Sequence, residues 1–193
     1  MQKLKVAVLI SGRGSNMKAL IAACKNPEFP AEIILVLSNK ENAAGLEFAK
    51  NKGIKTCVVN HKNFNSRQEF DKKMHEELEK AGAEIICLAG FMRLLSPWFV
   101  EKWLDHLINI HPSLLPEFKG ANAVADAIKA GVKKSGCTVH YVRAEMDEGP
   151  IIAQSAVDIL PNDNEESLAA RILTQEHLIY PSALKAVCER FRS

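Results

Sequence analysis

The feature that most constrains the fold of this chain is a series of short apolar runs that alternate with segments of helical periodicity. The runs lie at residues 5–10, 33–37, 54–59, 85–89 and 107–108. A continuous apolar run rich in β-branched residues is typical of a strand that is buried on both faces. Strands separated by helices are joined by right-handed crossovers and pair in parallel. The sequence therefore predicts an α/β protein with a mainly parallel, twisted sheet and helices on both faces.

The pattern changes after Gly131. Residues 137–142 and 151–157 are β-rich segments that only a short acidic turn joins. A connection this short implies a hairpin, so we expect a mixed sheet with an antiparallel hairpin at its C-terminal end. A last long helix follows, and Pro181 is expected to kink or split it.

Polar residues that can cap a helix stand before several helical segments. Ser66, with Glu69 three positions later, matches a capping box, and Asp163 with Glu166 repeats the pattern before the last helix. Asn42 can cap the helix after the second strand. The sequence thus predicts where these helices begin.

Length and composition indicate one globular domain over residues 1–193. The chain is 47% hydrophobic and 25% charged, which suits a substantial core. Its net charge is only +2 and its cations are dispersed, so neither nucleic acid nor a membrane is expected as a partner. The five cysteines stand singly, mostly among apolar neighbours, as in a reduced, cytoplasmic protein. We find no targeting or transmembrane segment in the sequence.

A glycine-rich turn, residues 11–16, comes directly after the first strand and before a helix. Such a unit presents backbone N–H groups and a helix N-terminus, the arrangement that holds a phosphate. The turn lacks the Gly-Lys-Ser/Thr of a Walker loop and the third glycine of the dinucleotide fingerprint. A phosphate site and a merely tight turn are both consistent with this pattern.

Polar side chains follow the fifth strand at the point where it must stop. Asn109 and His111 are two residues apart, so their side chains share one face. Pro112 and Pro116 prevent both further pairing and an immediate helix. An amide beside an imidazole at the carboxyl edge of a sheet can stabilise a developing negative oxygen. The alternative is a proline-rich turn whose polar groups only satisfy the local backbone.

The turns at 11–16, 90–95 and 109–116 should share one edge, because ligands of a parallel sheet gather beyond the carboxyl ends of its strands. On the hairpin turn, Asp147 can add a carboxylate that orients water or moves a proton. No nucleophile elbow and no zinc-ligand spacing occurs in the sequence, so covalent and metal-dependent catalysis have little support.

Each of these polar residues also has a structural interpretation. Asp147 can be a turn residue, His140 a hydrogen-bonded strand histidine and Glu176 a charge on a solvated helix. The combination of Asn109, His111 and Asp147 near one sheet edge is what favours a catalytic site.

Nearly the whole chain resembles a known enzyme family. The blocks that carry the resemblance are residues 10–16 (ISGRGSN), 88–97 (LAGFMRLLSP), 109–116 (NIHPSLLP), 136–140 (GCTVH), 147–152 (DEGPII) and 175–177 (QEH). In this order they resemble the phosphoribosylglycinamide formyltransferases, folate-dependent enzymes of purine biosynthesis. The resemblance implies a Rossmann-like formyltransferase fold and 10-formyltetrahydrofolate as cosubstrate, with no metal.

The resemblance implies that Asn109, His111 and Asp147 are the catalytic residues. The amine of glycinamide ribonucleotide would attack the formyl carbon of 10-formyltetrahydrofolate directly, giving a tetrahedral intermediate. Asn109 and His111 would hold the oxygen of that intermediate, while Asp147 would relay a proton through water.

The resemblance also implies binding residues for both substrates. Residues 1–105 would form the ribonucleotide- and phosphate-binding half, and residues 106–193 the catalytic and folate-binding half. The ribonucleotide would be held by Gly12, Arg13, Gly14, Ser15 and Asn16 at its phosphate and by Glu176 at its glycinamide side. The folate would be held by Arg67, Met92, Arg93, Leu94, Leu95, Arg143, Ala144, Glu145 and Met146, together with Asn109 and Asp147.

One segment departs from the family pattern. Lys119, Gly120, Ala121 and Asn122 stand where many members read Pro-Gly-x-His. Asn122 can donate and accept hydrogen bonds but cannot titrate, so the resemblance carries no role onto it.

Other functions remain as alternatives. A formyltetrahydrofolate deformylase uses similar residues to hydrolyse the same donor, and a methionyl-tRNA formyltransferase shares the catalytic strand. We expect neither the N-terminal regulatory domain of the first nor the C-terminal nucleic-acid-binding domain of the second, since the first strand opens the chain and the long helix closes it. A non-catalytic nucleotide-binding module of the doubly wound type fits the fold alone. We expect small-molecule substrates as partners, and a monomer or homodimer.

Overall fold

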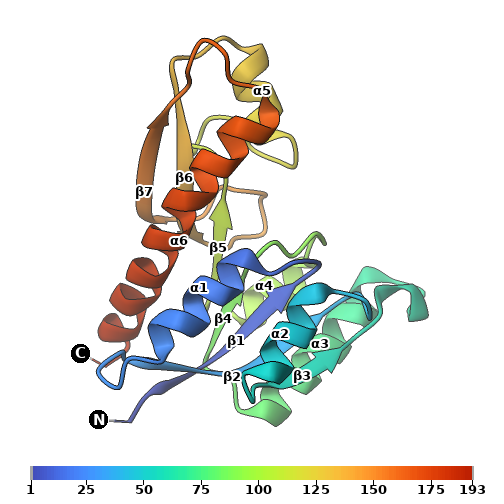
Figure 1. Ribbon diagram of the computed structural model, residues 1–193. Coiled ribbons are helices and arrows are strands. Elements are labelled where there is room, and N and C mark those ends of the chain that lie inside the picture. Colours follow the sequence, from blue (N-terminus) through green and yellow to red (C-terminus); the bar gives the residue numbers. More distant parts are fainter. Residues whose placement is uncertain (1, 193) are drawn as a thin grey trace.

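A single mixed sheet organises the computed structural model, which describes residues 2–192 (Figure 1). Within these residues seven strands run in the spatial order β3-β2-β1-β4-β5-β6-β7. The strands are β1 (Leu4–Ile10), β2 (Ala31–Ser38), β3 (Lys55–Val58), β4 (Ile85–Leu88), β5 (Leu107–His111), β6 (Lys134–Tyr141) and β7 (Ile151–Asp158). The helices are α1 (Ser15–Cys24), α2 (Ala44–Asn51), α3 (Arg67–Ala81), α4 (Pro97–Lys102), α5 (Ala123–Lys129) and α6 (Glu165–Arg190), with a 3-10 turn at His61–Asn63.

The pairing of the strands confirms the predicted mixed sheet. Strands β3, β2, β1, β4 and β5 pair in parallel, whereas β6 pairs antiparallel with both β5 and β7. The antiparallel register sets Asn109 of β5 opposite His140 of β6. Strand β5 continues through His111 instead of ending before Asn109, so both polar side chains stand on the strand itself.

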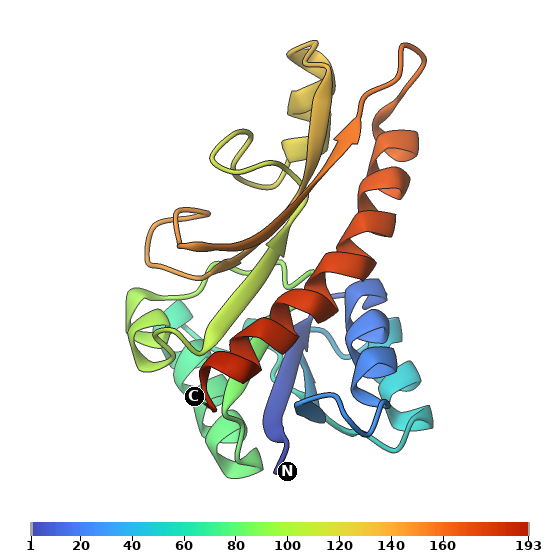
Figure 2. The ribbon, with the colours of Figure 1, turned by 90° about the vertical axis from the view of Figure 1, so that its left-hand side faces the viewer.

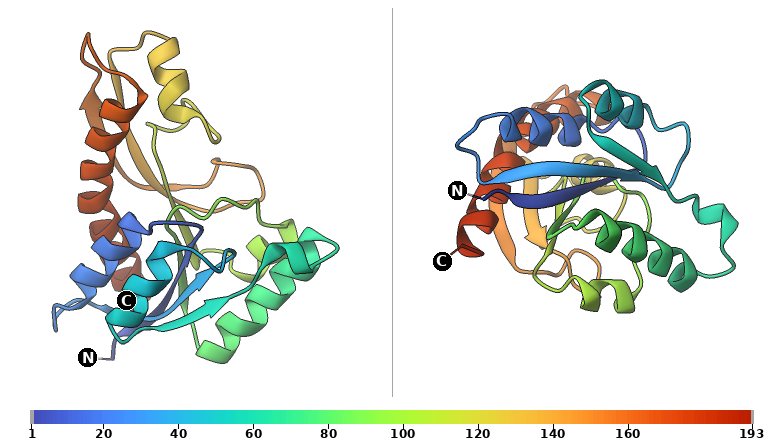
Figure 3. Two further views of the ribbon diagram at one scale, coloured as in Figure 1. Left: turned by 45° about the vertical axis from the view of Figure 1, so that its right-hand side comes forward. Right: turned by 90° about the horizontal axis from the view of Figure 1, so that it is seen from below.

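Burial on both faces explains the unbroken apolar runs. In β1, Val6, Val8 and Ile10 face one core and Ala7 and Leu9 face the other, as the alternation of side chains along a strand requires. Helices α1, α2 and α6 cover the first core, and α3 and α4 cover the second. Figure 3, seen from below, shows α1 and α2 on one face of the sheet and α3 and α4 on the other.

The last helix differs from the sequence prediction in its cap, and of the two predicted effects of Pro181 the split does not occur. Asn164 caps α6, with its side chain accepting from the Ser167 amide, while Asp163 pairs with Arg171 at 2.7 Å. The helix also runs through Pro181 without being split. Packing offsets the backbone bond that proline removes, because α6 lies along α1 and the β6–β7 hairpin (Figure 2).

The other predicted caps divide in the same way. The hydroxyl of Ser66 accepts from the Glu69 amide at the start of α3, as predicted. Asn42 does not cap α2, and that prediction is wrong. The amide of Gly45 in the first turn of α2 donates instead to the carbonyl of Gly12, which lies on the glycine-rich turn. A contact distant in sequence has replaced the local cap.

The cysteines form no disulfide bonds among the described residues. Cys24, Cys57, Cys87, Cys137 and Cys188 are all free thiols. Burial raises the pKa of Cys137 to about 12, which leaves its thiol unreactive. Among residues 2–192 no helix is both long and apolar enough to cross a membrane.

Candidate active site

The predicted turns meet at the carboxyl edge of the parallel strands. The amide of Ser11 donates to the carbonyl of Gly90 at 3.1 Å, and the Ser11 hydroxyl accepts from the Met92 amide at 2.8 Å. The same hydroxyl donates to Asn39 Oδ1, at 2.6 Å. Ser11 therefore joins the glycine-rich turn to the turn after β4 and to the end of β2.

The glycine-rich turn encloses a hollow of about 260 Å³ at the N-terminus of α1. Gly14 caps the helix in the left-handed conformation, with φ 66°, and no side chain occupies the free N–H groups of the first turn. The first turn also carries no acidic residue. Lys40, at the end of β2, lines the same hollow. Free N–H groups, a helix dipole and a cation make this hollow suited to a phosphate.

Glu176 of α6 contacts Asn16, one of the residues that line this hollow. The Asn16 side chain donates to its Oε2 at 2.6 Å, and both residues are buried. Burial raises the pKa of Glu176, while the Asn16 hydrogen bond and the charge of His111 oppose the rise. Asn16 Oδ1 is buried and has no partner among the described residues, so it remains free to accept from a substrate donor.

Asn109 is oriented by His140, the residue opposite it on β6. His140 Nδ1 lies 2.9 Å from the Tyr141 carbonyl, which assigns its proton to Nδ1 and leaves Nε2 as an acceptor. The Asn109 amide nitrogen lies 3.3 Å from that Nε2. Burial lowers the pKa of His140, against smaller opposing contributions from the Tyr141 carbonyl and Asp147. A neutral His140 thus takes one amide hydrogen of Asn109 and leaves the other available.

His111 and Asp147 meet beside this pair. His111 Nε2 lies 2.9 Å from the Phe118 carbonyl, to which it donates, and its Nδ1 lies 3.5 Å from Asp147 Oδ2. Asp147 Oδ1 lies 3.7 Å from His140 Nε2. The contact with His111 is an ion pair when Nδ1 carries a proton. The carboxylate of Asp147 is therefore placed between two imidazoles.

This arrangement suits attack on a carbonyl carbon. The Asn109 amide and a protonated His111 can donate to a developing oxyanion, and Asp147 can accept or relay a proton within the same group. Glu176 links the hollow suited to a phosphate to Asn109, His111 and Asp147, because its carboxylate lies near His111. The geometry supports acyl transfer between a bound anion and a second substrate.

A profile described as "Formyl transferase" matches residues 4–184. The chain belongs to the formyl transferase family. It is 42% identical over 178 residues to phosphoribosylglycinamide formyltransferase of Escherichia coli (strain K12), covering 92% of this chain and 84% of that protein. The crystal structure of phosphoribosylglycinamide formyltransferase from Brucella melitensis superposes with a TM-score of 0.92 at 47% identity, over 97% of this chain and 96% of that one.

A longer relative matches at higher identity. The chain is 52% identical over 185 residues to trifunctional purine biosynthetic protein adenosine-3 of Gallus gallus. This match covers 96% of the chain but only 18% of the length of that protein. The chain thus spans less than a fifth of the length of that relative.

Several residues predicted to hold the second substrate of this formyl transferase are exposed apolar groups near the site. Met92 is 70% exposed, Leu94 56% and Met146 53%, which is unusual for such side chains. Ala144 and Glu145 are exposed on the same turn as Met146, whereas Leu95 is half-buried and packs on the second core. These apolar groups provide a surface for an aromatic ligand.

Arg67 and Arg93 come together around Asp71. Burial raises the pKa of the Asp71 carboxyl, and the hydrogen bond from Ser96 and the charges of both arginines oppose the rise. Asp71 Oδ2 accepts from the Ser96 amide at 2.6 Å, which fixes the end of the turn after β4. Two cations therefore stand beside the exposed apolar surface.

Arg143, which the sequence predicts to bind folate, forms an ion pair within the protein instead. Its guanidinium lies 2.6 Å from Asp105 Oδ1 and 3.0 Å from the Val142 carbonyl. It also packs against the Tyr141 ring, at 5.9 Å from the centroid. A substrate would meet Arg143 already paired.

The segment that departs from the family pattern has contacts of its own. Lys119 Nζ lies 2.7 Å from Glu148 Oε1, and the Gly120 amide donates to Asp147 Oδ2 at 2.9 Å. Asn122 stands at the cap position of α5 without a side-chain capping bond. The segment therefore contacts the turn that carries Asp147.

His140 and Lys40 are the residues that sequence reasoning did not assign to the site. Asn109 and His140 are 31 positions apart and meet only through the β5–β6 register. The register between β5 and β6, which the sequence does not show, would have been needed to identify His140. Lys40 had no comparable signal, since it follows β2 as an ordinary surface lysine.

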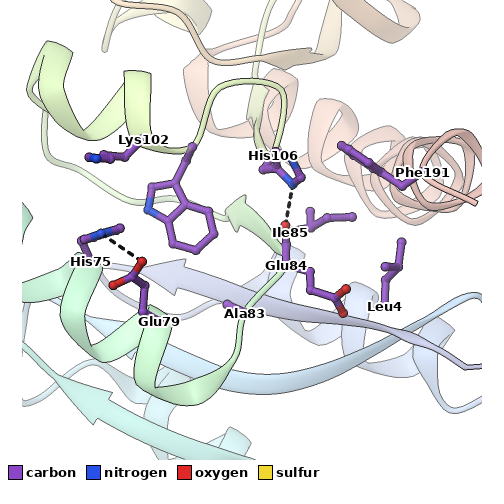
Figure 4. Close-up of a pocket in the computed structure, with 10 residues that line it drawn as sticks. Leu4, His75, Glu79, Ala83, Glu84, Ile85, Lys102, His106 and Phe191 are labelled. Atoms are coloured by element: carbon purple, nitrogen blue, oxygen red, sulfur yellow. Dashed lines mark hydrogen bonds and ion pairs between the residues drawn. The ribbon is translucent and has the colours of Figure 1, made fainter.

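A larger hollow, of about 550 Å³, lies at the opposite end of the parallel strands. Figure 4 shows His75 pointing toward Glu79 and His106 bonded to the Glu84 backbone on its walls. None of the predicted site residues lines it. Among the described residues, no group of His, Cys, Asp and Glu is arranged to hold a metal ion.

Proposed function

We propose that this chain transfers the formyl group of 10-formyltetrahydrofolate to the amine of glycinamide ribonucleotide in purine biosynthesis. The observation that carries the proposal is the contact between Asn16 and Glu176 beside His111. This contact joins the hollow suited to a phosphate to the oxyanion donors. Formyl transfer to a phosphorylated amine requires both sites to be close together. The formyl transferase family and the named relatives support the same reaction.

The ribonucleotide occupies the hollow at the start of α1. Gly12, Gly14 and Ser15 offer backbone N–H groups to its phosphate, and Arg13 and Lys40 add positive charge. Glu176 faces the glycinamide amine. Residues 1–105 thus form the phosphate-binding half of a single domain, 1–193, and residues 106–193 bring the catalytic groups.

The amine attacks the formyl carbon and forms a tetrahedral intermediate. Asn109, held by neutral His140, and His111 donate to the oxygen as it gains charge. Asp147 receives the proton of the attacking amine through water and returns one to the leaving folate nitrogen. No covalent enzyme intermediate is needed.

The folate lies across the exposed apolar groups Met92, Leu94 and Met146, with the turn that holds Ala144 and Glu145 along its edge. Arg67 and Arg93 bind its carboxylates. Leu95 and Arg143 support this surface through the second core and the Asp105 pair. The partners are these two small molecules, with no nucleic acid or membrane, and the enzyme acts in the cytoplasm as a monomer or homodimer.

The runner-up function is hydrolysis of the same formyl donor. A steady-state assay that follows release of tetrahydrofolate, with and without glycinamide ribonucleotide, separates the two reactions. The proposal predicts release only with the ribonucleotide. Equal release in its absence would identify a deformylase, and binding without release would identify a non-catalytic module.

A further inference from the structure

Asp147 lies in a backbone conformation that needs support from outside its own turn. Its φ of 57° is left-handed, which a residue with a Cβ adopts only at a cost. The turn over residues 142–150 contains no helix or strand. Glu145, Met146 and Glu148 around it are exposed. Contacts with another segment must therefore hold its carboxylate against His111.

The backbone of residues 118–120 bonds to both His111 and Asp147. The Phe118 carbonyl accepts from His111 Nε2, and the Gly120 amide donates to Asp147 Oδ2, each at 2.9 Å. Phe118 and Gly120 both have left-handed backbones, with φ of 51° and 87°. One short, strained segment thus binds both members of the His111–Asp147 pair.

A second contact joins residues 118–120 to the turn that carries Asp147, this time through side chains. Lys119 Nζ lies 2.7 Å from Glu148 Oε1, with side-chain exposures of 35% and 52%. Lys119 precedes Gly120 and Glu148 follows Asp147, so the ion pair is adjacent in sequence to the Gly120–Asp147 bond. Within residues 2–192 neither side chain forms a second ion pair. Removing either charge therefore releases one specific contact between the segments.

We infer that Lys119 and Glu148 are positioning residues that hold Asp147 within reach of His111 during formyl transfer. The kinetic consequence of this inference rests on the proposed function. An exposed ion pair adds little to the stability of a whole fold, but this one lies directly beside the Gly120–Asp147 hydrogen bond. Small displacements of a proton-transfer group lower the rate of the chemical step. Loss of the pair should thus lower kcat and leave the KM for the ribonucleotide unchanged, because the hollow at α1 lies on another segment.

The inference is tested with variants that remove or exchange the charges. Lys119→Met and Glu148→Gln should each lower kcat about twofold to fivefold, the range expected for one exposed ion pair. The double variant Lys119→Glu with Glu148→Lys should recover most of this loss, which a merely structural role of either side chain would not produce. Lys134→Met is the matched control, because it breaks an exposed pair with Asp158 on β6 and β7; its kcat should equal that of the wild type.

Hydrogen exchange of the Gly120 amide, measured without substrates, gives a second result that does not depend on activity. Hydrogen exchange of this amide should be about twofold to fivefold faster in the single variants than in the wild type. In the double variant with swapped charges and in Lys134→Met it should equal the wild-type rate. A wild-type chain without transferase activity would refute the proposed function and leave this exchange result to decide the inference. The inference would be overturned if the Gly120 amide of the single variants exchanged hydrogen at the wild-type rate. It would also be overturned if the double variant with swapped charges had a kcat as low as the single variants.

Discussion

The side-chain amide of Asn16 donates a 2.6 Å hydrogen bond to the carboxylate of Glu176, although the two residues stand 160 positions apart. Asn16 lies in the first turn of α1 and Glu176 in the middle of α6. The bond places the buried carboxylate of Glu176 between the hollow at the start of α1 and His111. The two proposed halves of the site therefore meet in one contact.

Replacing Glu176 by Gln should stabilise the fold and weaken substrate binding. Burial raises the pKa of this carboxyl, so its contribution to stability is present below its ordinary value of 4.5 and is lost as the pH rises through the raised pKa. At pH 8 we expect the variant to melt about 2–4 °C higher, with no gain at pH 4. The KM for the ribonucleotide should rise about tenfold, since a charged hydrogen bond is lost. Calorimetry and steady-state kinetics measure both, and an unchanged melting temperature at pH 8 would contradict the account.

His140 should make stability depend on pH. Its folded pKa lies below the ordinary value of 6.5, chiefly because of burial. The unfolded chain therefore binds the proton more readily, and stability is lost as the pH falls from about 6.5 through the folded pKa. In His140→Gln, the fall in stability that comes from protonation of this imidazole should disappear. Urea unfolding at several pH values measures it, with His61→Gln as a control outside the site; identical pH dependence in wild type and His140→Gln would count against the neutral, buried imidazole.

Turnover should be sensitive to the loss of either Asp147 or His111. Asp147→Asn removes the proton acceptor and keeps the shape, and His111→Ala removes one oxyanion donor. Each should lower kcat about 10²–10³-fold with little change in circular dichroism. Near-normal turnover in either variant would remove that residue from the mechanism.

Gly149 should be required for the turn that carries Asp147. A Cβ at this position would meet the Tyr141 carbonyl, a backbone atom that cannot rotate away. Gly149→Ala should therefore displace the turn and cost about 1–3 kcal/mol of stability, with a larger fall in kcat than in the affinity for phosphate. Gly53→Ala is a suitable control, because nothing lies within 4 Å of its added Cβ, although its positive φ adds some strain. Equal kinetics in Gly149→Ala and wild type would show that the turn tolerates the shift.

The sequence predicted the sheet because its signal is local. Each buried strand carries its own apolar run, and the short link between β6 and β7 forces a hairpin. The failures have the opposite character. Asn42 lost its capping role to the Gly12 carbonyl, and α6 is not split at Pro181 because the helix packs against α1 and the β6–β7 hairpin. Contacts between distant segments decided both.

The candidate site shows the same division. Asn109 and His111 could be paired from their spacing on one strand, and Asp147 from its turn. His140 could not be assigned, because its partnership with Asn109 depends on the antiparallel register. Glu176 entered only through the family resemblance, since nothing local distinguishes it from other helix charges before α6 packs on α1.

The central claim is tested most directly by following a ¹³C-labelled formyl group in a single reaction. The protein is mixed with [¹³C-formyl]-10-formyltetrahydrofolate and glycinamide ribonucleotide, and the label is observed by NMR. The account predicts that the label appears on the ribonucleotide amine, with no free formate, and that none is released when the ribonucleotide is omitted. Labelled formate at the same rate with and without the ribonucleotide would contradict it.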